Sequence, residues 1–227
     1  METEKCNISL INVTTLLEMV FITVLLAFLI RILHNNPVNY QRQPALPFLL
    51  LSVAIAPTLL RRKSVSELGL HFEGFGMSLR VLGKTCIVML PILICSILLL
   101  NHYEIALPLC PVIPERNLVS WSIYQFLCVA FAEEVFFRGY LQSSMGYYLS
   151  STLRKNPAIS AQISVVISAA IFSLFHGLAS GNAVSLFTFF PGMIFGWLFI
   201  RTKSLVAPIL FHGLSNISYG LLVLLLP

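Results

Sequence analysis

Long apolar stretches recur along the whole chain, and they constrain its fold more than any other feature. A helix that crosses a bilayer needs about 20 apolar residues, because the hydrocarbon core is about 30 Å thick. About seven stretches approach this requirement, and polar segments containing proline, glycine or basic residues separate them. We predict spans at about 10–33, 46–60, 81–100, 118–151, 158–178, 183–200 and 205–226. The sequence therefore predicts an all-α, polytopic transmembrane helical bundle, with residues 64–84 forming an interfacial segment.

The scarcity of charge shows how little of the chain can lie outside a bilayer. Charged residues make up 10% of the 227 residues and hydrophobic residues 57%, whereas soluble domains carry roughly 25% charged residues. We expect one integral-membrane domain over residues 1–227, without repeats, and the lipid bilayer as its main partner. The net charge of +5 reflects the loops and does not indicate a nucleic-acid partner. The sequence leaves the oligomeric state open.

The basic residues favour one orientation in the membrane. Lys and Arg accumulate in cytoplasmic loops, which is the positive-inside rule. When the basic cluster at 61–63 is placed inside, all but three of the 14 basic residues fall on the inner half, the exceptions being Arg31, Arg42 and Arg116. This distribution predicts an N-terminus inside and a C-terminus outside.

Two adjacent glutamates followed by an arginine stand in the fourth predicted span. Ionisable side chains inside a span cost on the order of 2.5–3.5 kcal/mol each, so they persist when they are paired or functional. Glu134 and Arg138 are four residues apart and share a helix face in the favoured acid-first order. Glu133 points about 100° away. We therefore expect Arg138 to neutralise Glu134 as structural support, and Glu133 to be the reactive group.

Two histidines and an asparagine in later spans are candidates to meet Glu133. His212 and Asn216 are four residues apart and therefore face the same way. At 1.5 Å per residue, Glu133 lies roughly 24 Å from the outer start of its span, and His212 roughly 22 Å from the outer chain end, so these two can meet. His176 is close to the outer loop at Ser180. It reaches the same level only if that loop dips into the membrane or its helix is displaced.

These residue types suit hydrolysis of a peptide bond inside the membrane. A carboxylate in a low-dielectric pocket can act as a general base on water, and a neutral histidine can hold that water. Histidine and asparagine side chains can donate hydrogen bonds to a developing oxyanion, which is usually a large contribution in acyl transfer. We therefore predict that Glu133 activates water and that His212 and Asn216 stabilise the oxyanion.

Several other chemistries fit the sequence less well. All nine acidic residues are glutamate, which excludes an aspartyl protease, and no GxSG segment supports a rhomboid-type serine protease. The five cysteines show no CxxC spacing, and Cys128 has no identified activator. Two alternatives stay open. One is a zinc-dependent protease with Glu133, His176 and His212 as ligands, although HExxH is absent; the other is a transporter or immunity protein with a buried Glu–Arg pair.

Three motifs occur in order in the second half of the chain. They are EExxxR at 133–138, FxxxH at 172–176 and HxxxN at 212–216. With them, the chain resembles the CPBP family, which comprises CAAX prenyl proteases and bacteriocin-processing proteins and is also called Abi. The resemblance covers about 118–227, which we expect to be the catalytic core. The first half of the chain is too generic to match.

The resemblance implies an intramembrane endopeptidase of the glutamic type. By position, Glu133 would activate the water and His176 would help to hold it. His212 and Asn216 would form the oxyanion site, supported by the Glu134–Arg138 pair. Family members have been described as metalloproteases, but we expect no cofactor, because asparagine is a poor zinc ligand. The substrate would be a membrane-associated protein or peptide, such as a bacteriocin precursor or a sorting-tag protein. The small size suits a bacterial inner-membrane protein.

Overall fold

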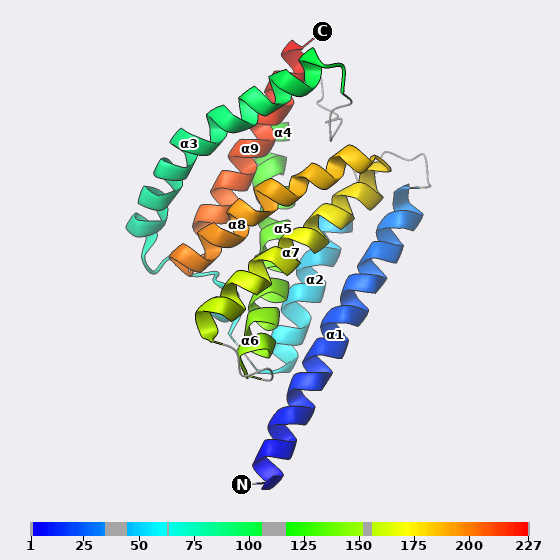
Figure 1. Ribbon diagram of the computed structural model, residues 1–227, viewed down its shortest axis with the longest axis vertical. Helices are drawn as coiled ribbons and strands as arrows, with labels where there is room; N and C mark the ends of the chain where they lie inside the picture. The colour runs from blue at the N-terminus through cyan, green and yellow to red at the C-terminus, as the bar shows by residue number, and fades with distance from the viewer. Residues whose placement is uncertain (1, 35–44, 63, 106–116, 152–155, 227) are drawn as a thin grey trace.

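The fold is a bundle of helices around one long central helix. The computed structural model describes residues 2–34, 45–62, 64–105, 117–151 and 156–226, and every regular element within these ranges is helical. The predicted all-α class is therefore confirmed. The elements outside the central helix are α1 (Glu2–His34), α2 (Ala45–Leu60), η2 (Val65–Leu68), α3 (Phe75–His102), α7 (Pro157–Ser180), η5 (Ala183–Thr188), α8 (Phe189–Thr202) and α9 (Val206–Leu225). In Figure 1, α1 and α2 lie on one side of the central helix, and α3 and α9 on the other.

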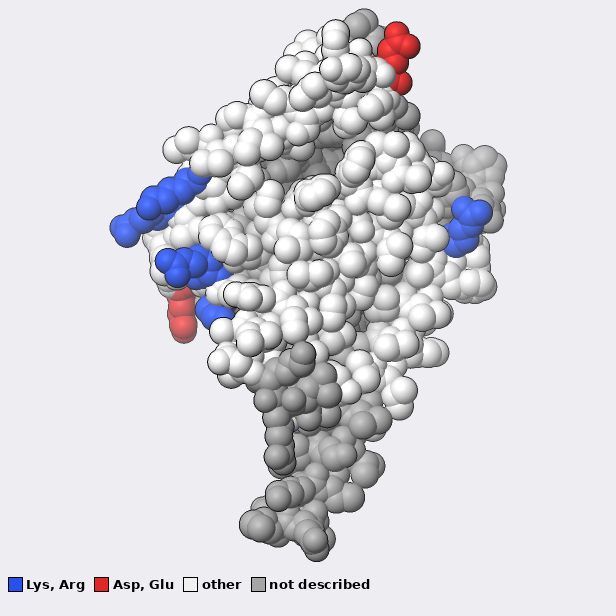
Figure 2. Space-filling model, in the orientation of Figure 1, with Lys and Arg blue, Asp and Glu red and all other residues white. Residues whose placement is uncertain are grey.

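The lengths and hydropathy of the helices identify an integral membrane protein. Within the described residues, five helices are long and apolar enough to cross a membrane: Phe75–His102, Leu118–Ser151, Pro157–Ser180, Ala183–Thr202 and Val206–Leu225. Two shorter apolar segments, Thr14–Leu29 and Leu46–Leu60, occupy the first and second predicted spans. Uncharged side chains cover most of the face shown in Figure 2. The predicted polytopic architecture is confirmed.

The third span begins earlier than the sequence indicated. Helix α3 starts at Phe75, so the interfacial segment predicted at 64–84 ends at Gly74 and the prediction is wrong beyond it. Gly74 adopts a left-handed conformation with φ 68° just before the helix, which few other residues tolerate. Arg80 and Lys84 are exposed in the first turns of α3. Long basic side chains at a helix end can reach the interface, so they do not interrupt the helix.

The central helix runs without a break from Leu118 to Ser151, but it is not α-helical throughout. Its successive parts are α4 (Leu118–Tyr124), η3 (Gln125–Ala130), α5 (Phe131–Glu134), η4 (Val135–Gln142) and α6 (Ser143–Ser151). Both η3 and η4 are π-helical. π-Helical turns are rare and occur frequently at functional sites. The four-residue α5 that separates them carries both glutamates of the EExxxR motif.

Small residues allow α8 to approach the central helix closely. Arg138 Nη2 donates to the carbonyl of Gly192 at 3.0 Å, and Gln142 Nε2 donates to the carbonyl of Gly196 at 3.2 Å. A Cβ added at Gly196 would lie 2.8 Å from Gln142 Oε1, so a larger residue would push the helices apart. Glycines at this four-residue spacing are typical of close packing between membrane helices. Arg138 and Gln142 of η4 thus each donate one hydrogen bond to the backbone of α8.

An ion pair ties the first two helices to the central one. Glu18 on α1 accepts a hydrogen bond from the hydroxyl of Tyr140 at 2.7 Å and pairs with Arg61 beyond the end of α2. The sequence showed Glu18 only as an interruption of the first span. Its two partners explain how a carboxylate persists there, because each compensates part of the cost of removing it from water.

Reporter fusions should confirm the predicted orientation. Figure 1 shows α1 beginning and α9 ending at opposite ends of the bundle, and Figure 2 shows basic side chains gathered where α3 begins and α8 ends. A fluorescent protein that matures only in the cytoplasm should be bright when fused after Arg62 and dark when fused after the C-terminus. Fluorescence from both fusions would contradict the topology. The basic residues that the predicted orientation uses and that lie outside the described ranges are Arg42, Lys63, Arg116, Arg154 and Lys155.

Candidate active site

The two neighbouring glutamates occupy different environments. The side chain of Glu134 is fully buried, whereas that of Glu133 retains 15% of its exposure. The short α-helical turn between two π-helical stretches fixes both of them on the central helix. Glu133 is therefore the less deeply buried of the two glutamate side chains, and Glu134 is held inside the protein.

Glu134 is the centre of a buried charge cluster. Its Oε1 accepts from Arg138 Nη1 at 3.0 Å, as the four-residue spacing predicts, and also from His212 Nδ1 at 2.8 Å. The guanidinium of Arg138 lies over the ring of Phe172, 4.6 Å from its centroid. Buried charges are stable when they are paired and their hydrogen bonds are made. The contact with His212 was not predicted, because its two partners are far apart in the sequence.

Glu133 faces both histidines. Its Oε2 lies 3.8 Å from His212 Nε2 and 4.0 Å from His176 Nε2. Within the described residues, this oxygen is buried and receives no hydrogen bond. Both distances exceed a direct hydrogen bond. They match a water molecule that bonds to a carboxylate and an imidazole at about 2.8 Å each.

The oblique course of α7 explains how His176 reaches Glu133. In Figure 1, α7 crosses in front of α5 at an angle, and its end lies well below the ends of α3 and α9. The sequence left two routes open for His176, and the structure places its Nε2 4.0 Å from Glu133 Oε2 on an inclined α7 (Figure 1).

The Nδ1 atoms of both histidines are fixed by acceptors. His176 Nδ1 bonds to the backbone carbonyl of Phe172 at 2.9 Å, and His212 Nδ1 bonds to Glu134. A carbonyl and a carboxylate can only accept, so both Nδ1 atoms carry a proton. Phe195 stacks on His212 with ring centroids 4.6 Å apart and planes 15° apart. Sequence reasoning missed Phe195, since nothing in its apolar surroundings distinguishes it.

Asn216 contacts a residue that sequence reasoning also missed. Its Nδ2 donates to Oε1 of Gln125 at 3.0 Å, and it lies one helical turn beyond His212 on α9. A polar side chain in an apolar span was the signal that identified Glu133. The same signal was present at Gln125.

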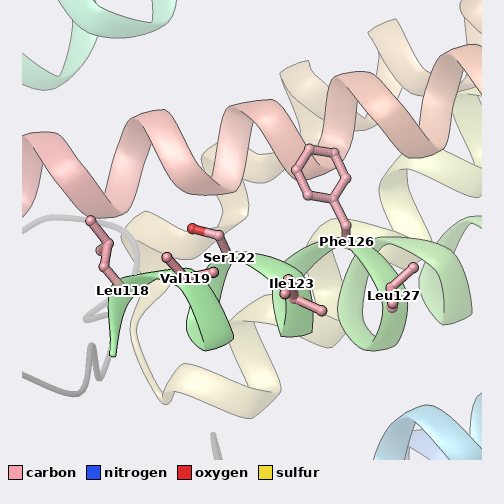
Figure 3. Close-up of a pocket in the computed structure, with 6 residues that line it drawn as sticks. All are labelled: Leu118, Val119, Ser122, Ile123, Phe126 and Leu127. Carbon is pink, nitrogen blue, oxygen red and sulfur yellow. The ribbon is translucent and has the colours of Figure 1, made fainter. Parts of the chain in front are cut away.

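An apolar groove lies on the central helix beside this site. It has a volume of about 490 Å³ and is lined by Leu118, Val119, Ser122, Ile123, Phe126 and Leu127. Figure 3 shows these side chains along α4 and η3, with Phe126 directed at α9. At that point α9 has Gly213, where a Cβ would overlap the Phe126 ring. The groove and the Glu133 site are thus on the same helix, the groove nearer its N-terminus.

The side chains that the structure describes do not, as placed, form a metal-binding group. Within the described ranges, no three His, Cys, Asp or Glu residues are grouped so that they could hold an ion. The three zinc-ligand candidates are Glu133, His176 and His212. Zinc would require their ligand atoms about 2.0–2.2 Å from one point.

One comparison with known proteins gives a match. Residues 115–218 match a family model described as Type II CAAX prenyl endopeptidase Rce1-like. This stretch includes all three motifs of the sequence, and the match confirms the resemblance to CPBP proteins. Neither the curated proteins nor the solved structures give a match to the chain.

Proposed function

We propose that this chain is a glutamic-type intramembrane endopeptidase. Its residues 115–218 match the model of the Rce1-like type II CAAX prenyl endopeptidases. It would hydrolyse a peptide bond in a membrane-associated protein or peptide. The family match supports a protease, and the apolar helices support a membrane setting. The catalytic roles, the metal-free mechanism and the substrate belong to the proposal.

The observation that carries the mechanism is the position of Glu133 opposite two histidines. A water molecule bound between Glu133 Oε2 and the Nε2 atoms of His176 and His212 would meet two imidazoles whose Nδ1 atoms are fixed by other contacts. Glu133 takes a proton from this water while the water oxygen attacks the carbon of the scissile carbonyl. The peptide C–N bond then breaks, and Glu133 returns the proton to the leaving amine.

The charges of the cluster balance throughout this step. Glu133 and Glu134 are negative, and Arg138 together with a doubly protonated His212 offsets them. When Glu133 accepts the proton, the negative charge moves to the substrate oxygen, where His212 Nε2 and Asn216 donate to it. Preorganised donors of this kind are effective because they need no rearrangement during the reaction. Glu134 supplies the counter-charge of His212 through the 2.8 Å contact.

These observations limit the proposed substrate only to a chemical class of peptide. The matched family is named for CAAX prenyl endopeptidases, so a peptide ending in a prenylated cysteine and three further residues is one candidate. An unprenylated membrane peptide, such as a bacteriocin precursor or a sorting tag, is the other. We place the enzyme in the bacterial inner membrane, with the N-terminus inside.

A zinc protease at the same residues is the rival mechanism. Histidines that bind zinc usually donate their other ring N–H to a carboxylate or carbonyl, and His176 and His212 both do so. Against it, the three side chains do not form a metal-binding group.

Purified protein should cleave one of the two peptide classes without added metal. Mass spectrometry in ¹⁸O-labelled water should show one labelled oxygen in the new carboxyl group, and cleavage should persist after treatment with a strong zinc chelator. Elemental analysis should find less than stoichiometric zinc. One zinc per chain, lost in His212→Ala together with activity, would favour the metalloprotease. Failure to cleave either class would contradict the proposed function.

A further inference from the structure

A glutamine on the central helix contacts a residue of the proposed site but has no part in the mechanism above. Gln125 is the first residue of η3, and its Oε1 accepts from Asn216 Nδ2 at 3.0 Å. Both side chains are partly buried. Polar side chains inside a membrane need partners, since the hydrocarbon offers none. The partner that Gln125 has is the residue expected to stabilise the oxyanion.

The packing interface between the central helix and α9 fixes the position of Gln125. The two helices run antiparallel, because Gln125 lies opposite Asn216 and Glu133 lies opposite His212. Between these two contacts, the ring of Phe126 fills the space left by the missing side chain of Gly213, and Figure 3 shows it directed at α9. The close approach at Gly213 holds Gln125 within reach of Asn216.

The π-helical stretch η3 allows both contacts, Gln125 with Asn216 and Glu133 with His212, to form in the same helix–helix interface. Gln125 and Glu133 are eight residues apart on the central helix, while Asn216 and His212 are one turn apart on α9. Eight residues of a regular α-helix advance about 12 Å and end about 80° out of line. The intervening π-helical stretch winds more slowly, which brings Gln125 towards the helix face that carries Glu133. The hydrogen bond between the two side-chain amides therefore depends on the π-helical geometry of η3.

The chemistry of the pair indicates what Gln125 does. The Asn216 amide nitrogen carries two N–H groups, and Gln125 Oε1 accepts a hydrogen bond from one of them. The terminal torsion of asparagine is otherwise broad and roughly two-fold, so an unpartnered amide would present either its nitrogen or its oxygen to the substrate. An oxygen facing the oxyanion would repel it. We propose that Gln125 is a positioning residue that holds the Asn216 amide with its second N–H available to the oxyanion. This inference rests on the proposed function.

A double-mutant cycle tests this role. Gln125→Leu removes the acceptor at similar size and should lower kcat about 10-fold with KM unchanged, because the effect arises in the transition state. Asn216→Ala should lower kcat about 100- to 1,000-fold, as expected for an oxyanion donor. The double variant should be no slower than Asn216→Ala, within about twofold, because Gln125 acts only through Asn216. The assay uses whichever peptide the wild type cleaves.

Controls separate positioning from folding. Ser96→Ala removes an exposed hydroxyl that donates to the carbonyl of Ile92 in its own helix at 2.8 Å, and it should leave kcat unchanged. If Gln125→Leu does not fold, the unbranched Gln125→Met replaces it. Multiplying losses in the double variant, or a wild-type kcat for the single one, would overturn the role of Gln125 alone. A fully active Asn216→Ala would instead overturn the oxyanion assignment in the proposed function, and the role of Gln125 with it.

Discussion

Glu133→Gln should lower cleavage at least about 100-fold while leaving the folded yield unchanged. Positioned general bases contribute typically 10²- to 10⁴-fold to rate, and the amide of glutamine is nearly isosteric with the carboxylate but cannot accept the proton. Glu133 makes no direct hydrogen bond at Oε2 within the described residues, so its replacement breaks no hydrogen bond there. The measurement is the initial rate on one peptide, together with the thermal stability of the detergent-solubilised protein.

A matched variant shows that the effect comes from the site and not from loss of an acid. Glu104→Gln removes a carboxylate that is exposed beyond the end of α3, and it should cleave at the wild-type rate. Normal cleavage by Glu133→Gln would remove this residue from the mechanism. A large loss of stability in Glu133→Gln would mean that the carboxylate is structural.

Glu134→Gln and Arg138→Gln should each lose roughly 3–5 kcal/mol of stability, the usual cost of removing one partner of a buried ion pair. Both side chains are fully buried and 3.0 Å apart, so either substitution leaves the other residue without its partner in this ion pair. Glu134→Gln also weakens the hold on His212, whose Nδ1 lies 2.8 Å from the same oxygen. We therefore expect it to lose activity as well as stability. Thermal unfolding in detergent, followed as a fall in apparent Tm, measures the first effect.

The double variant Glu134→Gln/Arg138→Gln separates the two contributions. It removes both members of the Glu134–Arg138 pair, so it should be more stable than at least one single variant, while cleavage should stay low because His212 has lost its carboxylate. Arg61→Gln is the comparison, since its ion pair with Glu18 is 31% exposed on both sides. Such pairs contribute about 0–1 kcal/mol. If Glu134→Gln were as stable as the wild type but inactive, the roles assigned to the two glutamates would be wrong.

The local features of this protein follow from the order of its residues. Apolar stretches of sufficient length predicted the helices and their number, because in hydrocarbon each backbone group must be satisfied within its own helix. The Glu134–Arg138 contact followed from four-residue spacing, since side chains one turn apart are neighbours on any helix. Both depend only on short-range geometry, which the tertiary structure leaves almost unchanged.

Contacts between helices depended on how the helices pack. The sequence could not place His176, because an upright α7 would carry it away from Glu133, and only the tilt of α7 across the central helix brings the two to 4.0 Å. The bonds from His212 to Glu134 and from Asn216 to Gln125 join helices far apart in the chain. Their register depends on the π-helical turns and on the close approach at Gly213, neither of which has a periodic signature. The sequence thus determined the spans and the charged pair, while helix tilt and register, set by side-chain packing over the whole bundle, decided which polar groups meet.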